Sequence, residues 1–328
     1  MNRGVVLGVD GGGSKTHLAL ASADGRLLAF ESGPGTNLES QKAADISATL
    51  FTLLVNACKK ADVGLRDIKA SCFGLCGVDI REDVIYAKRQ IIGKLGLPDE
   101  VKVHNDAFIG LFNDGFLGSG AVVTVGSGHK WLAVNGKREF MHDGLVFQGL
   151  KDMVMEELLK VAEGYTKASG FSSRMYRRVG FRSPDDFIRR WRYGGSRDYV
   201  KPIPAAAWNR LTRVQELLGR EAESGDSVAL SIINAYAVSL ADGTVVALRR
   251  VKASRPGQKV IMSGSVLVGI KPLRTAFARI LKGTLPGSVV VPARFRPIRG
   301  ALVYAGEMAW KGLPDGSLAE NVLRYPGV

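Results

Sequence analysis

The sequence contains few cysteines and no long apolar run, and each of these absences excludes a class of protein. Its 328 residues include three cysteines, Cys58, Cys72 and Cys76. A small, odd number of cysteines argues against a disulfide framework and favours a reducing cytoplasm. No uninterrupted apolar run approaches the ~20 residues of a membrane-spanning helix, and the first residues lack the charged segment and apolar core of a signal peptide. We therefore expect a cytoplasmic protein that does not span a membrane.

Two of the cysteines are close in sequence, which raises the question of a metal or cluster site. Cys72 and Cys76 both lie within Ala70–Val78. That segment is an apolar run typical of a buried strand that leads into a turn. We therefore interpret these residues as buried structural thiols, which behave as small apolar side chains.

Acidic residues are outnumbered by basic ones. The chain has 45 Lys and Arg against 31 Asp and Glu, which gives a formal net charge of +14. The basic residues are concentrated in Arg174–Arg197 and Arg249–Lys259. Such a pattern fits either a nucleic-acid-binding face or a protein that handles anionic small molecules. Because no helix-turn-helix, zinc-finger or RNP pattern accompanies the charge, we disfavour nucleic acid as a partner.

The length and the order of the elements predict an α/β protein with two domains. A chain of 328 residues exceeds what one hydrophobic core usually supports. Apolar runs at Val5–Val9, His17–Ala21 and Leu27–Glu31 predict three antiparallel strands joined by turns. Further strands are predicted over 70–75, 101–104, 121–125, 131–134, 260–262 and 289–291, and helices over 44–61, 83–95, 152–163, 184–193, 205–224, 227–252, 272–281 and 299–310.

The first glycine turn is the most informative segment. Asp10 ends a predicted strand and is followed by Gly11, Gly12, Gly13, Ser14, Lys15 and Thr16. Consecutive glycines let backbone N–H groups approach phosphate oxygens and allow positive φ angles, and Asp10 is placed to hold Mg²⁺ through water. A Walker loop and a Rossmann turn both require a following helix, whereas this chain continues as a strand. The alternative is an ordinary glycine-rich hairpin without a ligand.

Two later glycine turns also follow predicted strands. Gly126, Ser127 and Gly128 are placed to grip phosphates, and Gly264 with Ser265 are placed to face an adenosine. Each is a weak signal by itself, because Gly-Ser-Gly is a common turn. The order of the segments along the chain is what favours a nucleotide site.

Asn105 and Asp106 follow the predicted strand over 101–104. A carboxylate at a strand end can accept the proton of a sugar hydroxyl while that hydroxyl attacks a phosphoryl group. The alternative is that Asp106 serves as the N-cap of a helix over Ala107–Phe112.

Taken together, these segments resemble the N-acetylglucosamine kinases and the BadF/BadG-type ATPases of the actin/hexokinase/Hsp70 superfamily. The resemblance runs from end to end and is most specific in the first half. It is carried by Asp10–Thr16, Gly33–Asn37, Gly74–Asp79, Asn105–Ala107, Val123–Gly128, Ser263–Ser265 and Pro297–Ala305.

The resemblance implies an α/β fold of two ribonuclease-H-like, actin-like ATPase domains with a nucleotide cleft between them. The N-terminal lobe would span 1–118, and the C-terminal lobe, with a helical insertion, would span 119–328. The last helix, over about 299–311, would pack back on the N-terminal lobe. A homodimer is compatible with this family.

The resemblance also implies ATP with Mg²⁺ and phosphorylation of an amino-sugar hydroxyl, of the N-acetylglucosamine or glucosamine class. Asp106 would be the catalytic base and Asp10 the metal contact. The implied sugar contacts are Thr36, Asn37, Gly77, Asp79 and Asn105.

The chain departs from the family pattern in the segment after the second phosphate turn. The sugar kinases carry Gly-Gly-Trp-Gly and Gly-Asp-Glu-Gly-Ser motifs there, and neither is intact in His142–Asp152. Ser127 replaces the usual Thr, and the cysteines do not match the cluster-binding pair of BadF-like activators. Three alternatives therefore remain: an ATPase or activator without sugar kinase activity, a binding or regulatory protein, and a kinase of another hydroxylated or anionic small molecule.

Overall fold

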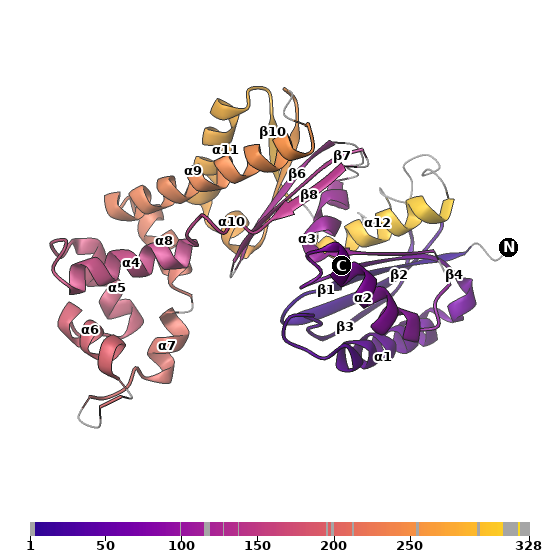
Figure 1. Ribbon diagram of the computed structural model, residues 1–328, viewed down its shortest axis with the longest axis horizontal. Coiled ribbons are helices and arrows are strands. Elements are labelled where there is room, and N and C mark those ends of the chain that lie inside the picture. Colours follow the sequence, from indigo (N-terminus) through magenta and orange to yellow (C-terminus); the bar gives the residue numbers. More distant parts are fainter. Residues whose placement is uncertain are drawn as a thin grey trace. The chain divides into compact units, whose positions relative to one another are not determined.

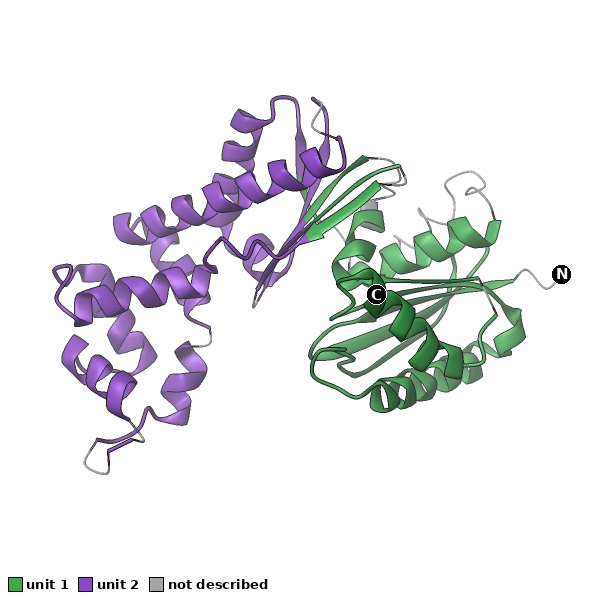
Figure 2. Ribbon diagram, in the orientation of Figure 1, with its two compact units in different colours: residues 1–122, 132–141, 291–328 green, residues 123–131, 142–290 purple. Residues whose placement is uncertain are grey.

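The computed structural model describes residues 4–98, 100–114, 119–126, 128–136, 138–194, 196–197, 200–211, 213–253, 256–293, 296–310 and 321. The chain divides into two compact units (Figure 2). Unit 1 contains residues 1–122, 132–141 and 291–328, and unit 2 contains residues 123–131 and 142–290.

A five-stranded mixed sheet with the order β3-β2-β1-β4-β5 forms the centre of unit 1. β1 and β2 pair antiparallel, and β1 pairs with β4 in parallel. The central strands β1 and β4 consist mainly of buried apolar residues. This composition fits their parallel pairing, because parallel strands are covered on both faces of the sheet. The strands are β1 (Val5–Gly11), β2 (Lys15–Ser22), β3 (Leu27–Pro34), β4 (Ile68–Leu75) and β5 (Val101–Asn105).

Helices cover both faces of this first sheet. On one face, α1 (Ala43–Ala61) buries a stripe of apolar side chains that includes Ile46, Leu50 and Leu54. Burial of each such side chain contributes roughly 1.5–3 kcal/mol. α12 (Pro297–Trp310) packs against β1 and β4, on the opposite side of the sheet from α1 (Figure 1). The remaining helices of this part are α2 (Arg81–Gln90) and α3 (Asp106–Ile109).

The second sheet also has five strands, in the order β10-β9-β6-β7-β8. The predicted α/β class is confirmed, with two mixed sheets of five strands each. The strands are β6 (Ser119–Val125), β7 (His129–Asn135), β8 (Arg138–His142), β9 (Lys259–Ser263) and β10 (Val289–Pro292).

The other described elements of unit 2 are helices. α4 packs against α6, α8 and α9, and α9 packs against α8 and α11. The helices are α4 (Leu150–Ala162), α5 (Gly170–Val179), α6 (Pro184–Tyr193), α7 (Ala205–Leu211), α8 (Val214–Glu223), α9 (Ser227–Arg250), α10 (Ser265–Gly269) and α11 (Lys271–Thr284).

α9 is the one helix of the described residues that is long and apolar enough to cross a membrane by length and composition. Polar residues such as Asn234 and Asp242 interrupt its apolar sequence, so it contains no uninterrupted apolar run of that length. Half of its apolar window is buried inside the protein, against neighbours that include α8 and α11. This packing is that of a core helix.

Candidate active site

The glycine turn of unit 1 joins β1 to β2. Gly11 pairs with Thr16 in the sheet register, and the Gly12 N–H donates to the Lys15 carbonyl over 2.9 Å. Ser14 and Lys15 are exposed at the tip. The hairpin thus holds the backbone of the turn in one conformation and leaves its polar side chains accessible.

The three glycines of this turn have different surroundings. A methyl group added to Gly11 would lie 2.3 Å from Thr36 Oγ1 and 2.7 Å from Leu75 Cδ2, so Gly11 is fixed by packing. The same addition at Gly12 would approach the Lys15 carbonyl oxygen at 3.2 Å, whereas at Gly13 it would meet no atom within 4 Å. None of these three glycines has a positive φ, so the expectation that the turn needs positive φ is wrong. The exposed backbone at Gly13 fits the close approach of a phosphate group.

Asp10 lies at the end of β1, beside this turn, where the predicted metal contact was placed. Its Oδ2 is 3.7 Å from Nδ1 of His17, the residue opposite it on β2. Mg²⁺ commonly binds proteins through one or two carboxylates together with substrate phosphates and water. Within the described part of the chain no group of three or more His, Cys, Asp or Glu could hold a metal by itself. A mostly buried carboxylate beside a glycine turn with an exposed tip therefore fits Mg²⁺ that arrives with a nucleotide.

The segment after β3 packs onto the glycine turn. The Thr36 N–H donates to the Gly12 carbonyl, and the hydroxyl oxygens of Thr16 and Thr36 are 2.9 Å apart and fully buried. These two hydroxyls are thus engaged with each other and position the turn. Asn37 is only partly buried, and its Oδ1 accepts from the Glu39 N–H.

The segment after β4 completes this group of loops. The Cys76 N–H donates to the Gly11 carbonyl, and the Cys76 carbonyl accepts from Leu38. Gly77 has a positive φ of 79° and lies against Asn37. The structure therefore brings the first glycine turn, Asn37 and Gly77 into one cluster, although the three segments are far apart in sequence.

Asn105, Asp106 and Asp79 form the second part of the site in unit 1. Asn105 is buried, and its Nδ2 donates to Asp79 Oδ1 over 2.6 Å. The Asn105 Oδ1 accepts from the Ala107 N–H over 2.9 Å, which makes Asn105 the N-cap of α3. The alternative that Asp106 caps this helix is therefore wrong, because Asp106 is already the first helical residue. Asp106 is partly buried, and the cap of α3 does not depend on it.

The glycine turns of unit 2 also lie together. The Gly126 N–H donates to the Gly128 carbonyl, and a methyl group added to either glycine would meet no atom within 4 Å. Gly264, with φ of 86°, packs so tightly on Val125 that an added Cβ would lie 2.2 Å from its carbonyl oxygen. The predicted adenosine and phosphate turns are thus adjacent, and Ser265 is exposed at the start of α10. Ser127 lies outside the described residues.

The segment that departs from the sugar kinase motifs is anchored by a buried tryptophan. His142 stacks on Trp131 with ring centroids 4.8 Å apart, and its Nε2 bonds to the Gly243 carbonyl. The Trp131 Nε1–H donates to the Leu240 carbonyl of α9. Beyond this anchor, Leu145 and Val146 are 97% and 88% exposed, so the segment presents apolar side chains where the resembling family has polar ones.

Comparison with known proteins identifies the family of this chain. A model of the BadF/BadG/BcrA/BcrD ATPase family matches residues 7–305. The chain belongs to this family. The match covers both units, and the predicted family resemblance is confirmed.

Individual relatives within reach of comparison share only modest sequence identity with this chain. An N-acetylmuramic acid/N-acetylglucosamine kinase of Clostridium acetobutylicum is 33% identical over 124 residues, which span 38% of this chain and 40% of that relative. An N-acetyl-D-glucosamine kinase of Dictyostelium discoideum is 22% identical over 260 residues, 74% of this chain and 78% of that relative. The structure of a candidate N-acetylglucosamine kinase from Chromobacterium violaceum has a TM-score of 0.61 at 19% identity, with 92% of this chain and 99% of that one covered. This structural likeness shows a shared fold.

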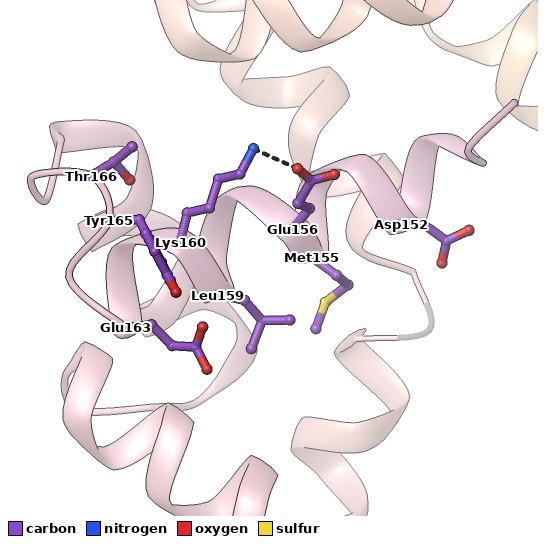
Figure 3. Close-up of a pocket in the computed structure, with 8 residues that line it drawn as sticks. All are labelled: Asp152, Met155, Glu156, Leu159, Lys160, Glu163, Tyr165 and Thr166. Atoms are coloured by element: carbon purple, nitrogen blue, oxygen red, sulfur yellow. Dashed lines mark ion pairs between the residues drawn. The ribbon is translucent and has the colours of Figure 1, made fainter.

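One pocket of this family member lies apart from the predicted nucleotide residues. It is a depression of about 610 Å³ along α4 and the turn that follows (Figure 3). Asp152, Glu156 and Glu163 contribute carboxylates to it, and Lys160 is paired with Glu156. Because carboxylates repel phosphates, this pocket does not fit a nucleotide.

Several residues near Asn105 were not predicted from the sequence to lie at the site. Arg81 and Lys88 on α2, and Lys102 and His104 on β5, line a second pocket that also contains Asp79 and Asn105. The alternation of Lys102 and His104 along a short strand was a signal that both face one side. No local pattern could show that α2 brings two further cations to the same pocket.

Proposed function

We propose that this protein is an ATP-dependent kinase that phosphorylates a hydroxyl of an amino sugar, of the N-acetylglucosamine or glucosamine class. Membership of the ATPase family supports the use of ATP, and the names of both curated relatives support an amino-sugar acceptor. One observation carries the proposal most directly: Asp106 follows Asn105, which is buried and bonded to Asp79, and Asp106 is not needed as the cap of α3.

In this proposal each residue has a defined task. The Gly13 backbone binds phosphate oxygens, and Asp10 binds Mg²⁺ through water. Asn37 and Asn105 orient sugar hydroxyls, while the Asn105–Asp79 bond keeps the Asn105 amide fixed. ATP supplies the phosphoryl group: its bond to the bridging oxygen of ADP breaks as the sugar oxygen bonds to phosphorus. Asp106 accepts the proton that the sugar hydroxyl loses.

Replacement of Asp106 tests the proposal. We expect Asp106→Asn to lower turnover by roughly 10²–10⁴-fold, because an amide cannot accept the proton. Nucleotide affinity and stability should hardly change, because Asn105 remains the cap. Turnover is measured as sugar-dependent release of ADP, and affinity by calorimetry.

Asp45→Asn is a matched control, since Asp45 is an exposed acidic residue in the first turn of α1. It should leave turnover unchanged. If Asp106→Asn also retained the turnover of the unmodified protein, Asp106 would not be the base and this mechanism would be wrong.

The exposed Leu145 and Val146 favour a second candidate, an ATPase that does not act on sugars. The segment lacks the polar motif through which the resembling kinases select their sugar, and such hydrogen bonds provide most of the discrimination between substrates. Release of ADP at the same rate with and without a panel of amino sugars would favour this second candidate. An increase that depends on one sugar would support the kinase.

A further inference from the structure

A second pocket in unit 1 wraps around the edge strand β5. Its volume is about 520 Å³, within the range of sites for small molecules. α2 contributes one wall and residues 139–141 of β8 another, and all its lining residues belong to unit 1. Asp79 and Asn105, the bonded pair next to Asp106, form part of its lining.

Three basic side chains line this pocket. Arg81 and Lys88 lie about two turns apart on α2, both exposed, and Lys102 comes from β5. Among the described residues none of the three has an acidic side chain within ion-pair distance, whereas Lys60, Arg174 and Arg190 do. Three unpaired cations at one cavity produce a positive potential that attracts anions.

His104 adds a neutral donor to the same pocket. Its ring stacks on Phe108 with centroids 3.8 Å apart, which fixes the orientation of the imidazole. The Nε2 atom is buried and has no hydrogen-bond partner. Burial, together with the charges of Lys102 and Lys88, lowers the pKa of His104 to about 4. At neutral pH the imidazole is therefore uncharged, and its Nε2–H tautomer can donate one hydrogen bond to a bound oxygen.

The three cations outnumber the two acidic residues that line the pocket, Asp79 and Glu139. Asp79 is engaged with the Asn105 amide. Burial raises the pKa of Glu139, an effect that Lys102 partly opposes, so the protonated form of Glu139 is favoured more than usual. The pocket therefore combines a basic wall with apolar surface from Val84, Phe108 and Leu132.

We propose that this pocket holds a negatively charged group, a carboxylate or a phosphate, carried by the acceptor sugar itself. The inference rests on the proposed sugar kinase activity and specifies its substrate class. Asn105 and Asp79 line the pocket, and Asp106 is the next residue along the chain. A sugar bound by Asn105 can thus present its hydroxyl toward Asp106 and its anionic substituent to Lys88, Lys102 and His104.

Steady-state kinetics with matched sugars test the proposal. N-acetylmuramic acid and N-acetylglucosamine differ by one carboxylate-bearing ether, and N-acetylglucosamine 6-phosphate offers a phosphate instead. We expect kcat/KM for at least one anionic sugar to exceed that for N-acetylglucosamine. The double variant Lys88→Gln/Lys102→Gln should lower this preference by roughly 10–100-fold, the usual effect of losing hydrogen bonds to a charged group.

A double variant with the same change in charge serves as the control. Lys59 and Lys94 are exposed lysines of unit 1 outside the pocket, and Lys59→Gln/Lys94→Gln should keep the preference. An equal loss in both double variants would attribute the effect to net charge and overturn the proposal. Stimulation of N-acetylglucosamine turnover by free lactate or inorganic phosphate would also overturn it, since the anion would then be a separate molecule.

Calorimetry separates this proposal from the proposed function. If no sugar increases ADP release but an anionic sugar binds and loses its affinity in Lys88→Gln/Lys102→Gln, the kinase activity fails and the anion pocket stands. If N-acetylglucosamine is phosphorylated and both anionic sugars neither bind nor react, the kinase stands and this inference is wrong.

Discussion

At the scale of single residues, adjacent positions in the chain have different tasks. Asn105 and Asp106 are both good helix-capping residues, so the sequence alone leaves the capping role open. In the structure Asn105 caps α3 with its Oδ1 and holds Asp79 with its Nδ2. The amide of Asn105 thus caps the helix and binds Asp79, and the neighbouring Asp106 is not required as the cap.

The same division of tasks applies to Gly11 and Gly13 and yields a prediction. We expect Gly11→Ala to destabilise unit 1 by about 1–3 kcal/mol, because its methyl group would overlap Thr36 and Leu75. Gly13→Val should leave stability nearly unchanged and weaken ATP binding at least ~10-fold, since its side chain would occupy the space that a phosphate needs. Urea unfolding and calorimetry distinguish the two effects. Unchanged ATP affinity in Gly13→Val would contradict the assignment of this turn to phosphate.

His104 predicts how stability depends on pH. Its pKa is lowered from 6.5 to about 4, so the unfolded chain binds a proton that the folded protein does not bind between these values. Stability should therefore fall as the pH decreases from 6.5 toward 4. Between pH 7 and pH 5 this residue should lower the free energy of unfolding by about 2 kcal/mol.

Urea unfolding of the protein and of His104→Phe at both pH values measures this contribution. The variant keeps an aromatic ring for the stack on Phe108 and cannot titrate. Its loss of stability on acidification should be smaller by the same amount, and an identical pH dependence in both proteins would refute the prediction.

At the scale of elements, the sequence predicts those whose own pattern determines them. The stripe over 44–61 is present as α1, and the three N-terminal runs are present as the antiparallel strands β1, β2 and β3. By contrast, β8 (Arg138–His142) has no alternating apolar pattern, and it is a strand because it pairs at the edge of the second sheet. Its existence depends on tertiary pairing, which a local pattern does not contain.

Two helices of unit 2 differ from the prediction. The helix predicted over 205–224 is interrupted, because α7 ends at Leu211 and α8 begins at Val214. α5 was not predicted, although Ser169 caps its start and Gly180, with φ of 101°, follows its end. The serine cap and the terminal glycine are typical of helix ends. The helix was not predicted because its first turn contains a glycine and two serines, which have low helix propensity.

Within the candidate site, the sequence identified strand ends and glycine turns but not their mutual contacts. The bond between Asn105 and Asp79 joins residues that are 26 positions apart, and the packing of Gly264 on Val125 joins more distant ones. Such contacts follow from the order of strands in the sheets, which a single sequence does not specify.

An ion-pair cluster that links α5 to α8 and α9 yields a prediction at this scale. Glu221 of α8 is 2% exposed and pairs with Arg174 at 2.7 Å and Arg178 at 2.9 Å, while Arg174 also contacts Asp226. We expect Glu221→Gln to lower stability by about 1–3 kcal/mol, because it leaves cations without their buried partner. Hydrogen exchange of α5 should increase in the same variant.

Glu216→Gln is the matched control on the same helix. Glu216 pairs with Arg213 at the surface, where such pairs contribute about 0–1 kcal/mol. Equal effects of the two substitutions would show that the buried cluster does not hold α5 in place.

At the scale of the whole molecule, the meaning of the +14 charge is the main question. Part of the first basic stretch is neutralised within the fold, since Arg174, Arg178 and Arg190 pair with acidic residues. Cations without such partners line the pocket at β5 instead. This distribution favours small anionic ligands over a polyanion that contacts one continuous basic face.

The distribution of charge leads to a prediction about nucleic acids. We expect a duplex oligonucleotide of random sequence to bind only through general electrostatic attraction, with a Kd of roughly 10⁻⁴–10⁻⁶ M that weakens steeply with salt. Fluorescence anisotropy at about 50 mM and about 200 mM salt, the range over which such binding is lost, measures this directly. The double variant Lys88→Gln/Lys102→Gln should change this weak binding little, although it impairs binding of an anionic sugar. Nanomolar binding that persists at the higher salt concentration would instead identify a nucleic-acid surface, and the basic residues of Arg174–Arg197 that lack acidic partners would then be the first to replace.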